Sequence, residues 1–239
     1  MEPNEPQILI TLVDELEHLP HVMSIVEQYS WYALDLEGVA LGRNGHITML
    51  QLAIDSKHVY CFDMLKLGDR AFGFLKPILE DGRRYKLCYD ARCDADALYH
   101  RHGITLRGVV DMQVLYTMVH QHPSDPFLKG LCHTLTHAGI VEPQFLDGVL
   151  ACKLECKNKM KLHGSRLFTN RPLTLQVLQY CVLDVVYLFA MCRQWAPRCA
   201  CFESVLYISQ ARSMLYVGLS PKVLKSCVMS MVDFRIPSH

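Results

Sequence analysis

Two carboxylates lie two positions apart in an apolar segment, the stretch YALDLEGVAL at residues 32–41. Residues two apart in a β-strand point to the same face, so Asp35 and Glu37 share one face while Leu34 and Leu36 share the other. Burying an unpaired carboxylate costs a large amount of free energy. These two acids must therefore face water, pair with a cationic side chain or bind a cation.

A second acidic position lies in the stretch YCVLD at residues 180–184. Tyr180 and Asp184 are four residues apart, which places them on one face of a helix, one turn from each other. The surrounding residues are apolar on every side, and a helix that is apolar all round is expected to be buried. Asp184 is therefore a charge in a buried element and needs partners.

Three aspartates occur in YDARCDADALY at residues 89–99, where a helix is expected to follow a short strand. Asp90 suits the N-cap position of that helix. Asp94 lies about one turn later, where it could reach inward past the end of the sheet. Asp96 is expected to be a solvated helix carboxylate.

Carboxylates from one strand end and two helices could converge on divalent cations. Oxygen ligands suit Mg²⁺ or Mn²⁺ rather than zinc. Two such ions about 4 Å apart can clamp the attacking and leaving oxygens of a phosphoryl transfer. We therefore interpret Asp35 and Glu37 as ligands of a two-metal site.

The elements that would position these acids can be read from the sequence pattern. Strands are expected at 32–41 and 46–55, joined as a hairpin by the turn Arg43-Asn44-Gly45. Early strands followed by strands alternating with helices indicate an α/β domain with a mixed sheet. Further strands are expected at 59–62, 86–89 and 106–111, helices at 12–29, 69–80, 91–102, 126–139, 172–195 and from 203 onward, and a polar, Lys-rich connector at 151–171.

Composition excludes several classes of protein. The 239 residues include 24 Lys and Arg and 24 Asp and Glu, so a tail-like basic binder of nucleic acid is not expected. Eleven cysteines form no C-x-x-C pair, and no export signal or membrane span is expected. We expect a reducing compartment, nuclear or cytoplasmic with the nucleus slightly favoured. His133 and His137 have helical spacing but no third ligand, so zinc is not expected there.

The acidic motifs, taken together, resemble the DEDDy class of 3′–5′ exonucleases, the group that contains ribonuclease D, proofreading domains and the Werner-syndrome exonuclease. YALDLEGVALGRNGHITMLQLA resembles the D-x-E-G…G-R-x-G…L-Q-x-A opening of its Egalitarian-like branch, which includes the "exonuclease 3′–5′ domain-containing" proteins. YDARCDADALYHRHGI, VVDMQVLY and RPLTLQVLQYCVLDVVYL resemble the later motifs in the same order. The similarity spans roughly residues 30–195.

The resemblance implies a ribonuclease H-like mixed β-sheet flanked by helices. It divides the chain into a lead-in at 1–29, a 3′–5′ exonuclease domain at 30–195 and a C-terminal helical extension at 196–239 packed on the domain. Carried over by position, Asp90 and Asp96 do not match ligands, and Tyr180 would orient the attacking water. The implied ligands of two Mg²⁺ or Mn²⁺ ions are Asp35, Glu37, Asp94 and Asp184.

The implied activity is hydrolysis of single-stranded RNA from its 3′ end, releasing nucleoside 5′-monophosphates. Small nuclear or other small non-coding RNAs are the expected substrates, and no membrane partner is expected. The sequence departs from the family at Tyr89, where His is common, and at Phe168, where Trp is common, which affects the shape of the groove. The expected phosphate contacts are the basic side chains of the connector, whose alternative role is solubility: Lys153, Lys157, Lys159, Lys161, Arg166 and Arg171.

Three other functions stay open at this stage. A catalytically unused RNA-binding adaptor of the Egalitarian type is one, although all four ligand positions and the tyrosine are retained, which favours an enzyme. An exonuclease directed at DNA is the second, because nothing in the sequence reads the 2′-hydroxyl. The third is an interaction or scaffold protein whose tail at 203–239 docks a partner. The apolar stretch SCVMSMV at 226–232 could face that partner or pack on the domain, and packing on the domain is favoured.

Overall fold

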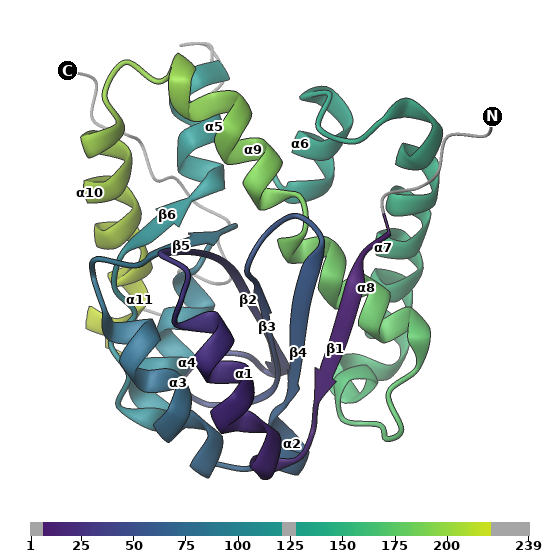
Figure 1. Ribbon diagram of the computed structural model, residues 1–239. Helices are drawn as coiled ribbons and strands as arrows, with labels where there is room; N and C mark the ends of the chain where they lie inside the picture. The colour runs from purple at the N-terminus through teal and green to yellow at the C-terminus, as the bar shows by residue number, and fades with distance from the viewer. Residues whose placement is uncertain (1–6, 121–127, 221–239) are drawn as a thin grey trace.

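The computed structural model describes residues 7–120 and 128–220, and these form a mixed six-stranded sheet flanked by helices (Figure 1). The strand order is β1-β4-β3-β2-β5-β6. The α/β class and the ribonuclease H-like mixed sheet are therefore confirmed. The strands are β1 (Leu9–Val13), β2 (Trp31–Val39), β3 (His46–Ala53), β4 (His58–Asp63), β5 (Tyr85–Cys88) and β6 (Val109–Asp111).

The centre of the sheet is an antiparallel meander of β2, β3 and β4. The predicted hairpin is confirmed, since β2 and β3 pair across the loop that contains Arg43-Asn44-Gly45. On one side β1 pairs parallel with β4, and on the other β5 and β6 continue parallel to β2. The two acids of β2 therefore lie on a central strand, with β3 and β5 as neighbours.

Helices cover both faces of this sheet. The α-helices of the described residues are α1 (Leu19–Val26), α2 (Met64–Leu67), α3 (Arg70–Glu80), α4 (Arg92–His102), α5 (Met112–His120), α6 (Leu131–His137), α7 (Pro143–His163), α8 (Leu175–Val185), α9 (Leu188–Trp195), α10 (Phe202–Ser213) and α11 (Leu215–Gly218). Short 3₁₀ turns lie at η1 (Leu16–His18), η2 (Gly164–Phe168) and η3 (Ala196–Arg198).

Two hydrophobic clusters show which helices cover which face. Tyr32, Leu34 and Leu36 of β2 belong to the cluster formed with α1, α3 and α4. Ala33 belongs to the other cluster, formed with α5, α8 and α9. Because Asp35 and Glu37 alternate with the leucines, they project from the face that α8 covers.

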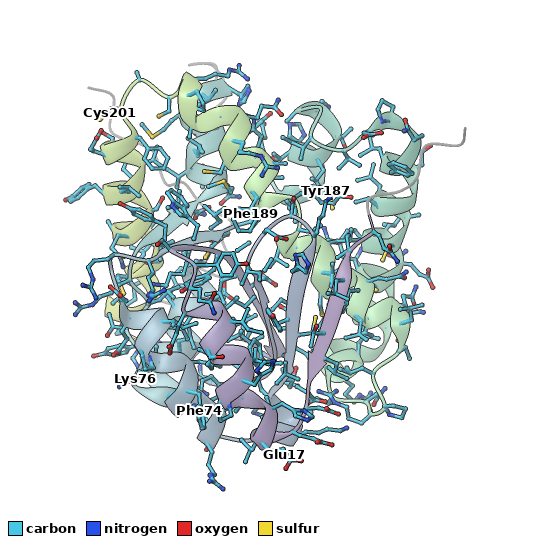
Figure 2. All side chains as sticks on the ribbon, viewed as in Figure 1. Glu17, Phe74, Lys76, Tyr187, Phe189 and Cys201 are labelled. Carbon is cyan, nitrogen blue, oxygen red and sulfur yellow. The ribbon has the colours of Figure 1, made fainter. Side chains whose placement is uncertain are left out.

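The secondary structure of several segments differs from the prediction made from the sequence. The expected connector at 151–171 is mostly helix, since α7 runs through Pro143–His163 and is followed by η2. Leu12 belongs to strand β1 rather than to a helix. The late helix begins at Leu175, with Thr174 as its N-cap, rather than at Pro172, and it breaks between α8 and α9, where Figure 2 labels Tyr187 and Phe189. Residues 126–127 of another expected helix and the stretch 226–232 lie outside the described residues.

Among residues 7–120 and 128–220, one helical segment, Leu175–Arg198, is long and apolar enough to cross a membrane by length and composition alone. It comprises α8 and α9, which pack on the sheet, and core helices of globular domains meet the same criterion. The ten cysteines within the described residues are free thiols. Cys201 is exposed beside the start of α10 (Figure 2).

Candidate active site

Strand β2 carries the first two acids to the end of the sheet. The pairing of β2 with β3 shifts between Glu37 and Gly38, which is a bulge immediately after the second acid. A Cβ atom at Gly38 would lie 2.1 Å from the carbonyl oxygen of His46, so only glycine allows the two strands to close here. The bulge places Glu37 at the point where the register of the pairing shifts, and such bulges are common next to functional sites.

Helix α8 brings Tyr180 and Asp184 against these acids. The side chain of Thr174 caps its N-terminus by accepting a hydrogen bond from the backbone N–H of Val177, at 3.3 Å. Carboxylate oxygens of Asp35, Glu37 and Asp184 lie within 4.8 Å of one another. The structure therefore brings together acids that are about 150 residues apart in the chain, as the sequence predicted they could be.

Asp94 approaches the same place from the first turn of α4 and is 7% exposed. It lies outside the group of three acids within 4.8 Å. Its carboxylate accepts hydrogen bonds from its own backbone N–H and from that of Leu36, the residue between Asp35 and Glu37. Asp94 is thus anchored to the backbone of the strand that carries the other acids.

The four acids repel one another in a poorly solvated place. Burial raises the pKa of Asp35 well above its usual range, and the charges of Asp184, Asp94 and Glu37 add to the shift. Burial followed by the charge of Asp184 does the same to the pKa of Glu37. Burial and the charge of Asp90 raise the pKa of Asp94 to about 8. Because ionising these carboxylates together costs free energy, a bound cation of high charge would stabilise their ionised form most.

Lys153 of α7 supplies one positive charge to the cluster. Its side chain is buried, and its ammonium contacts the carboxylate of Asp184 and lies 3.8 Å from the centre of the Tyr180 ring. Burial would lower the pKa of Lys153, but the charge and hydrogen bond of Asp184, with the charges of Asp35 and Glu37, raise it. Lys153 is therefore not the exposed phosphate contact expected from the Lys-rich connector, because its ammonium is buried against Asp184.

An unpaired buried amide borders the acids. Gln51 on β3 lies directly opposite Asp35, is fully buried, and its amide forms no hydrogen bond with the described residues. Asp184, in contrast, has the ion pair with Lys153. Buried polar groups are normally satisfied, so the Gln51 amide fits a site that holds a cation and its water.

A family comparison agrees with this geometry. The model of the 3′–5′ exonuclease family matches residues 10–198, which is most of the chain. The chain belongs to the 3′–5′ exonuclease family. Its fold is that of a nuclease hydrolase, and DEDD-type exonucleases typically use divalent metals.

Individual relatives and structures are similar to this exonuclease domain. The mouse "piRNA biogenesis protein EXD1" is 31% identical over 193 residues, which are 78% of this chain and 33% of that protein. The human protein of the same name is 28% identical, over 78% of this chain and 36% of its own length. The chain thus spans about a third of the curated relatives it matches.

Solved structures share the fold. Trypanosoma brucei RNase D in complex with RNA U12 has a TM-score of 0.75 and 23% identity, covering 90% of this chain and 73% of that one. Escherichia coli RNase D has a TM-score of 0.69 and 18% identity, covering 89% and 52%.

The basic residues predicted to contact phosphate differ in their surroundings: some are held in ion pairs and others are exposed. Arg171 is held by an ion pair with Asp63, at 2.7 Å between Nη2 and Oδ1, and it hydrogen-bonds backbone carbonyls of its own loop. Lys159 pairs with Glu155 at 3.0 Å. The exposed members of the predicted set are Lys157, Lys161 and Arg166.

Two expectations about the aspartates of α4 are wrong. Asp90 is not the N-cap, which is Ala91; its own φ is +65°, and its carboxylate pairs with Arg92 at 2.6 Å. Asp96 is not solvated, since its side chain is 1% exposed and pairs with Arg43 at 2.7 Å. The left-handed backbone of Asp90 and the distant partner of Asp96 are features that the local sequence pattern does not reveal.

The two departures from the family motif have structural partners. The Tyr89 hydroxyl hydrogen-bonds the carbonyl oxygen of Lys129 at 2.7 Å and the hydroxyl of Thr134 at 2.6 Å, tying β5 to α6. Phe168 is buried against the Tyr180 ring, with 6.0 Å between ring centres. Phe168 therefore supports Tyr180 at the site, while Tyr89 joins the end of β5 to α6.

A groove of about 1030 Å³ lies beside α8, between β1 and α7. It is lined by Ile8, Phe145 and Val182 among others, and none of the four acids borders it. The carboxylate cluster therefore defines the candidate site of the exonuclease domain, rather than this larger groove.

Proposed function

We propose that this chain is the catalytic domain of a metal-dependent 3′–5′ exoribonuclease that trims single-stranded RNA ends and releases nucleoside 5′-monophosphates. The observation that supports it most is the meeting of Asp35, Glu37 and Asp184 within 4.8 Å, next to Tyr180. RNA rather than DNA is supported by the identity of similar proteins, an RNase D bound to RNA and a piRNA biogenesis protein. Small non-coding RNAs are the proposed substrates.

The proposed ligands of two Mg²⁺ or Mn²⁺ ions are Asp35, Glu37, Asp94 and Asp184. Ions bound there would lower the pKa of a water and stabilise charge on the leaving oxygen. Asp35 and Glu37 project from one rigid strand, and Asp94 is held to the same strand by the backbone of Leu36. The protein therefore contributes preorganised negative charge, which costs no rearrangement when the reaction occurs.

Tyr180 is proposed to orient the attacking water. Burial and the charges of Asp184, Glu37 and Asp35 raise the pKa of its hydroxyl, so it stays protonated at neutral pH and can donate a hydrogen bond. Its ring is fixed by Phe168 on one side and by the ammonium of Lys153. A donor held this firmly limits the directions from which water can approach the phosphodiester.

A second candidate is an RNA-binding adaptor that does not use the site for catalysis. The Lys153–Asp184 contact favours it, because the buried ammonium already neutralises part of the acidic charge. In this alternative, the ammonium of Lys153 neutralises the acidic charge that a metal ion would neutralise in an enzyme.

One experiment separates these functions. Purified chain is incubated with 5′-labelled single-stranded RNA and DNA of the same sequence, with Mg²⁺, Mn²⁺ or chelator. The proposal predicts a ladder of shortened RNA, 5′-monophosphate products, little action on DNA and no reaction in chelator. Tight RNA binding without shortening, under every metal condition, would support the adaptor and contradict the enzyme. Asp35→Asn serves as the matched inactive variant.

A further inference from the structure

We infer that Arg43 is a positioning residue for the active site, which couples the strand of Asp35 and Glu37 to the helix of Asp94 and to the C-terminal helices. We call Arg43, Asp96 and the backbone carbonyls of Tyr216 and Leu219 the clasp. This inference rests on the proposed function, because it concerns how one proposed metal ligand is held.

Arg43 lies in the loop that follows β2, six residues after Glu37. Its backbone N–H donates to an Asp96 carboxylate oxygen at 2.7 Å, and its guanidinium grips both oxygens of the same carboxylate, with Nη2 to Oδ1 at 2.7 Å. Asp96 lies two residues after Asp94 on α4. The loop that follows Asp35 and Glu37 is thus bound to α4, the helix that carries Asp94, by both the main chain and the side chain of Arg43.

Close packing around Asp96 supports a specific fit. Gly42 has φ of +134°, which L-residues rarely adopt, and a Cβ atom there would lie 3.3 Å from an Asp96 oxygen. The side chain of Asp96 is 1% exposed and that of Arg43 is 9% exposed. Burying an ion pair without loss of stability requires good geometry and further hydrogen bonds, which this pair has.

The same guanidinium reaches the C-terminal helices. Arg43 donates to the carbonyl oxygen of Tyr216 and, at 2.7 Å, to that of Leu219. Further along α4, the ring of His100 lies 3.2 Å from the carbonyl oxygen of Val217. These contacts lie beyond residue 198, where the family match ends. The α11 region is therefore joined to the active-site helix by hydrogen bonds to buried charge.

A second buried arginine reinforces the start of α4. Arg212 of α10 is 1% exposed, and it pairs with Asp111 and, at 3.1 Å, with Asp90. Asp90 has a left-handed backbone directly before α4, and its N–H donates to Asp111 at 3.1 Å. A non-glycine residue in this conformation needs support from its surroundings. The segment directly before α4 is thus held by Arg212 of α10, both directly and through Asp111.

The clasp should increase the affinity of the site for metal by holding Asp94 in place. Residues that hold metal ligands in place typically contribute 10- to 100-fold to metal affinity. If the clasp acts by positioning Asp94, loosening the clasp should matter only while Asp94 is a carboxylate. A purely structural role would weaken metal binding whether or not that carboxylate is present.

The test is a double-mutant cycle on the full chain, with Mn²⁺ alone as the probe and free Mn²⁺ measured by electron paramagnetic resonance. The clasp is replaced by apolar side chains in Arg43→Met/Asp96→Leu, in the wild type and in Asp94→Asn. We expect about tenfold weaker Mn²⁺ binding in the wild-type background and no further loss in Asp94→Asn. A matched control, Asp14→Asn/Lys66→Met, removes a 2.7 Å surface pair and should leave affinity unchanged.

Three outcomes overturn the inference. One is unchanged Mn²⁺ affinity in the folded clasp variant, and another is an equal loss in both backgrounds. The third is an unchanged affinity in Asp94→Asn alone, which identifies the proposed metal site as the point of failure. If Arg43→Met/Asp96→Leu does not fold, Arg43→Lys replaces it, because lysine keeps the charge but loses the forked contact. A smaller loss, again absent in Asp94→Asn, is then expected.

Discussion

The ammonium of Lys153 contacts the carboxylate of Asp184 inside the acidic cluster, although the two residues are carried by different helices. This pair makes the cluster partly neutral without any ion. It also ties α7 to α8 at the position where Tyr180 faces the strand acids. Replacing the lysine therefore tests whether it and a divalent ion compete for the same carboxylates.

Replacing Lys153 with methionine should destabilise the metal-free protein and strengthen its response to metal. Removing one partner of a largely buried ion pair leaves the other charge uncompensated, which typically costs about 3–5 kcal/mol. Thermal unfolding in chelator should show a lower Tm than wild type, and Mn²⁺ should raise the Tm of the variant by more. An equal Mn²⁺ response in both proteins would mean that the lysine and the ion do not share the cluster.

The free energy of unfolding of the metal-free protein should depend on pH because the carboxylates of the acidic cluster bind protons. A carboxylate whose pKa is raised by folding binds more protons in the folded than in the unfolded state, so stability falls as pH rises through that interval. Burial and the charge of Asp90 raise the pKa of Asp94 from an ordinary value of 3.8 to about 8 in the folded protein. In chelator, the free energy of unfolding should decline between about pH 4 and pH 8.

Asp94→Asn provides the comparison for that decline. The amide cannot ionise, so its free energy of unfolding should fall less over the same pH range, measured by urea denaturation at each pH. Identical slopes for the variant and wild type would show that Asp94 does not carry the raised pKa.

Tyr180→Phe should separate water orientation from metal binding. Phenylalanine keeps the ring that packs on Phe168 and under the Lys153 ammonium but removes the hydroxyl. We expect RNA hydrolysis about 100-fold slower, since small losses of positioning have effects of this size, with unchanged Mn²⁺ affinity. Hydrolysis at the wild-type rate would remove Tyr180 from the mechanism.

Part of this site could be predicted because it depends on local periodicity. Asp35 and Glu37 follow the two-residue repeat of a strand, and Tyr180 and Asp184 follow the four-residue spacing of a helix. The chain positions that flank them are apolar and set their direction. Local pattern was therefore sufficient to find the acids that the structure brings together.

The burial of Lys153 could not be predicted in the same way. Helix α7 leaves Leu154 and Leu162 exposed, at 60% and 77%, while it buries a lysine, so its hydrophobic pattern does not mark the inner face. The pairing of Asp96 was also hidden, because its partner Arg43 lies 53 residues earlier. Such tertiary partners override the usual expectation that charged residues face water.

The exposed lysines of α7 allow a separate test of RNA contact. If Lys157 and Lys161 touch phosphates, Lys157→Ala/Lys161→Ala should reduce the slope of log affinity against log salt by about 1.4, at about 0.7 per single-strand contact. A matched pair outside α7 is Lys76→Ala/Arg83→Ala, since both side chains are exposed; Figure 2 labels Lys76 on α3, across the molecule from α7. Equal slopes for both pairs would mean that the α7 lysines serve solubility.

Mn²⁺ binding to the wild-type chain and to Asp35→Asn tests the central claim most directly, because Asp35 lies at the centre of the acidic group. Titration followed by electron paramagnetic resonance should count two ions per wild-type chain and a large loss of affinity in the variant. RNA shortening should disappear in parallel, while circular dichroism shows an unchanged fold. Absence of bound Mn²⁺ in the wild type, or equal binding in Asp35→Asn, would contradict the account.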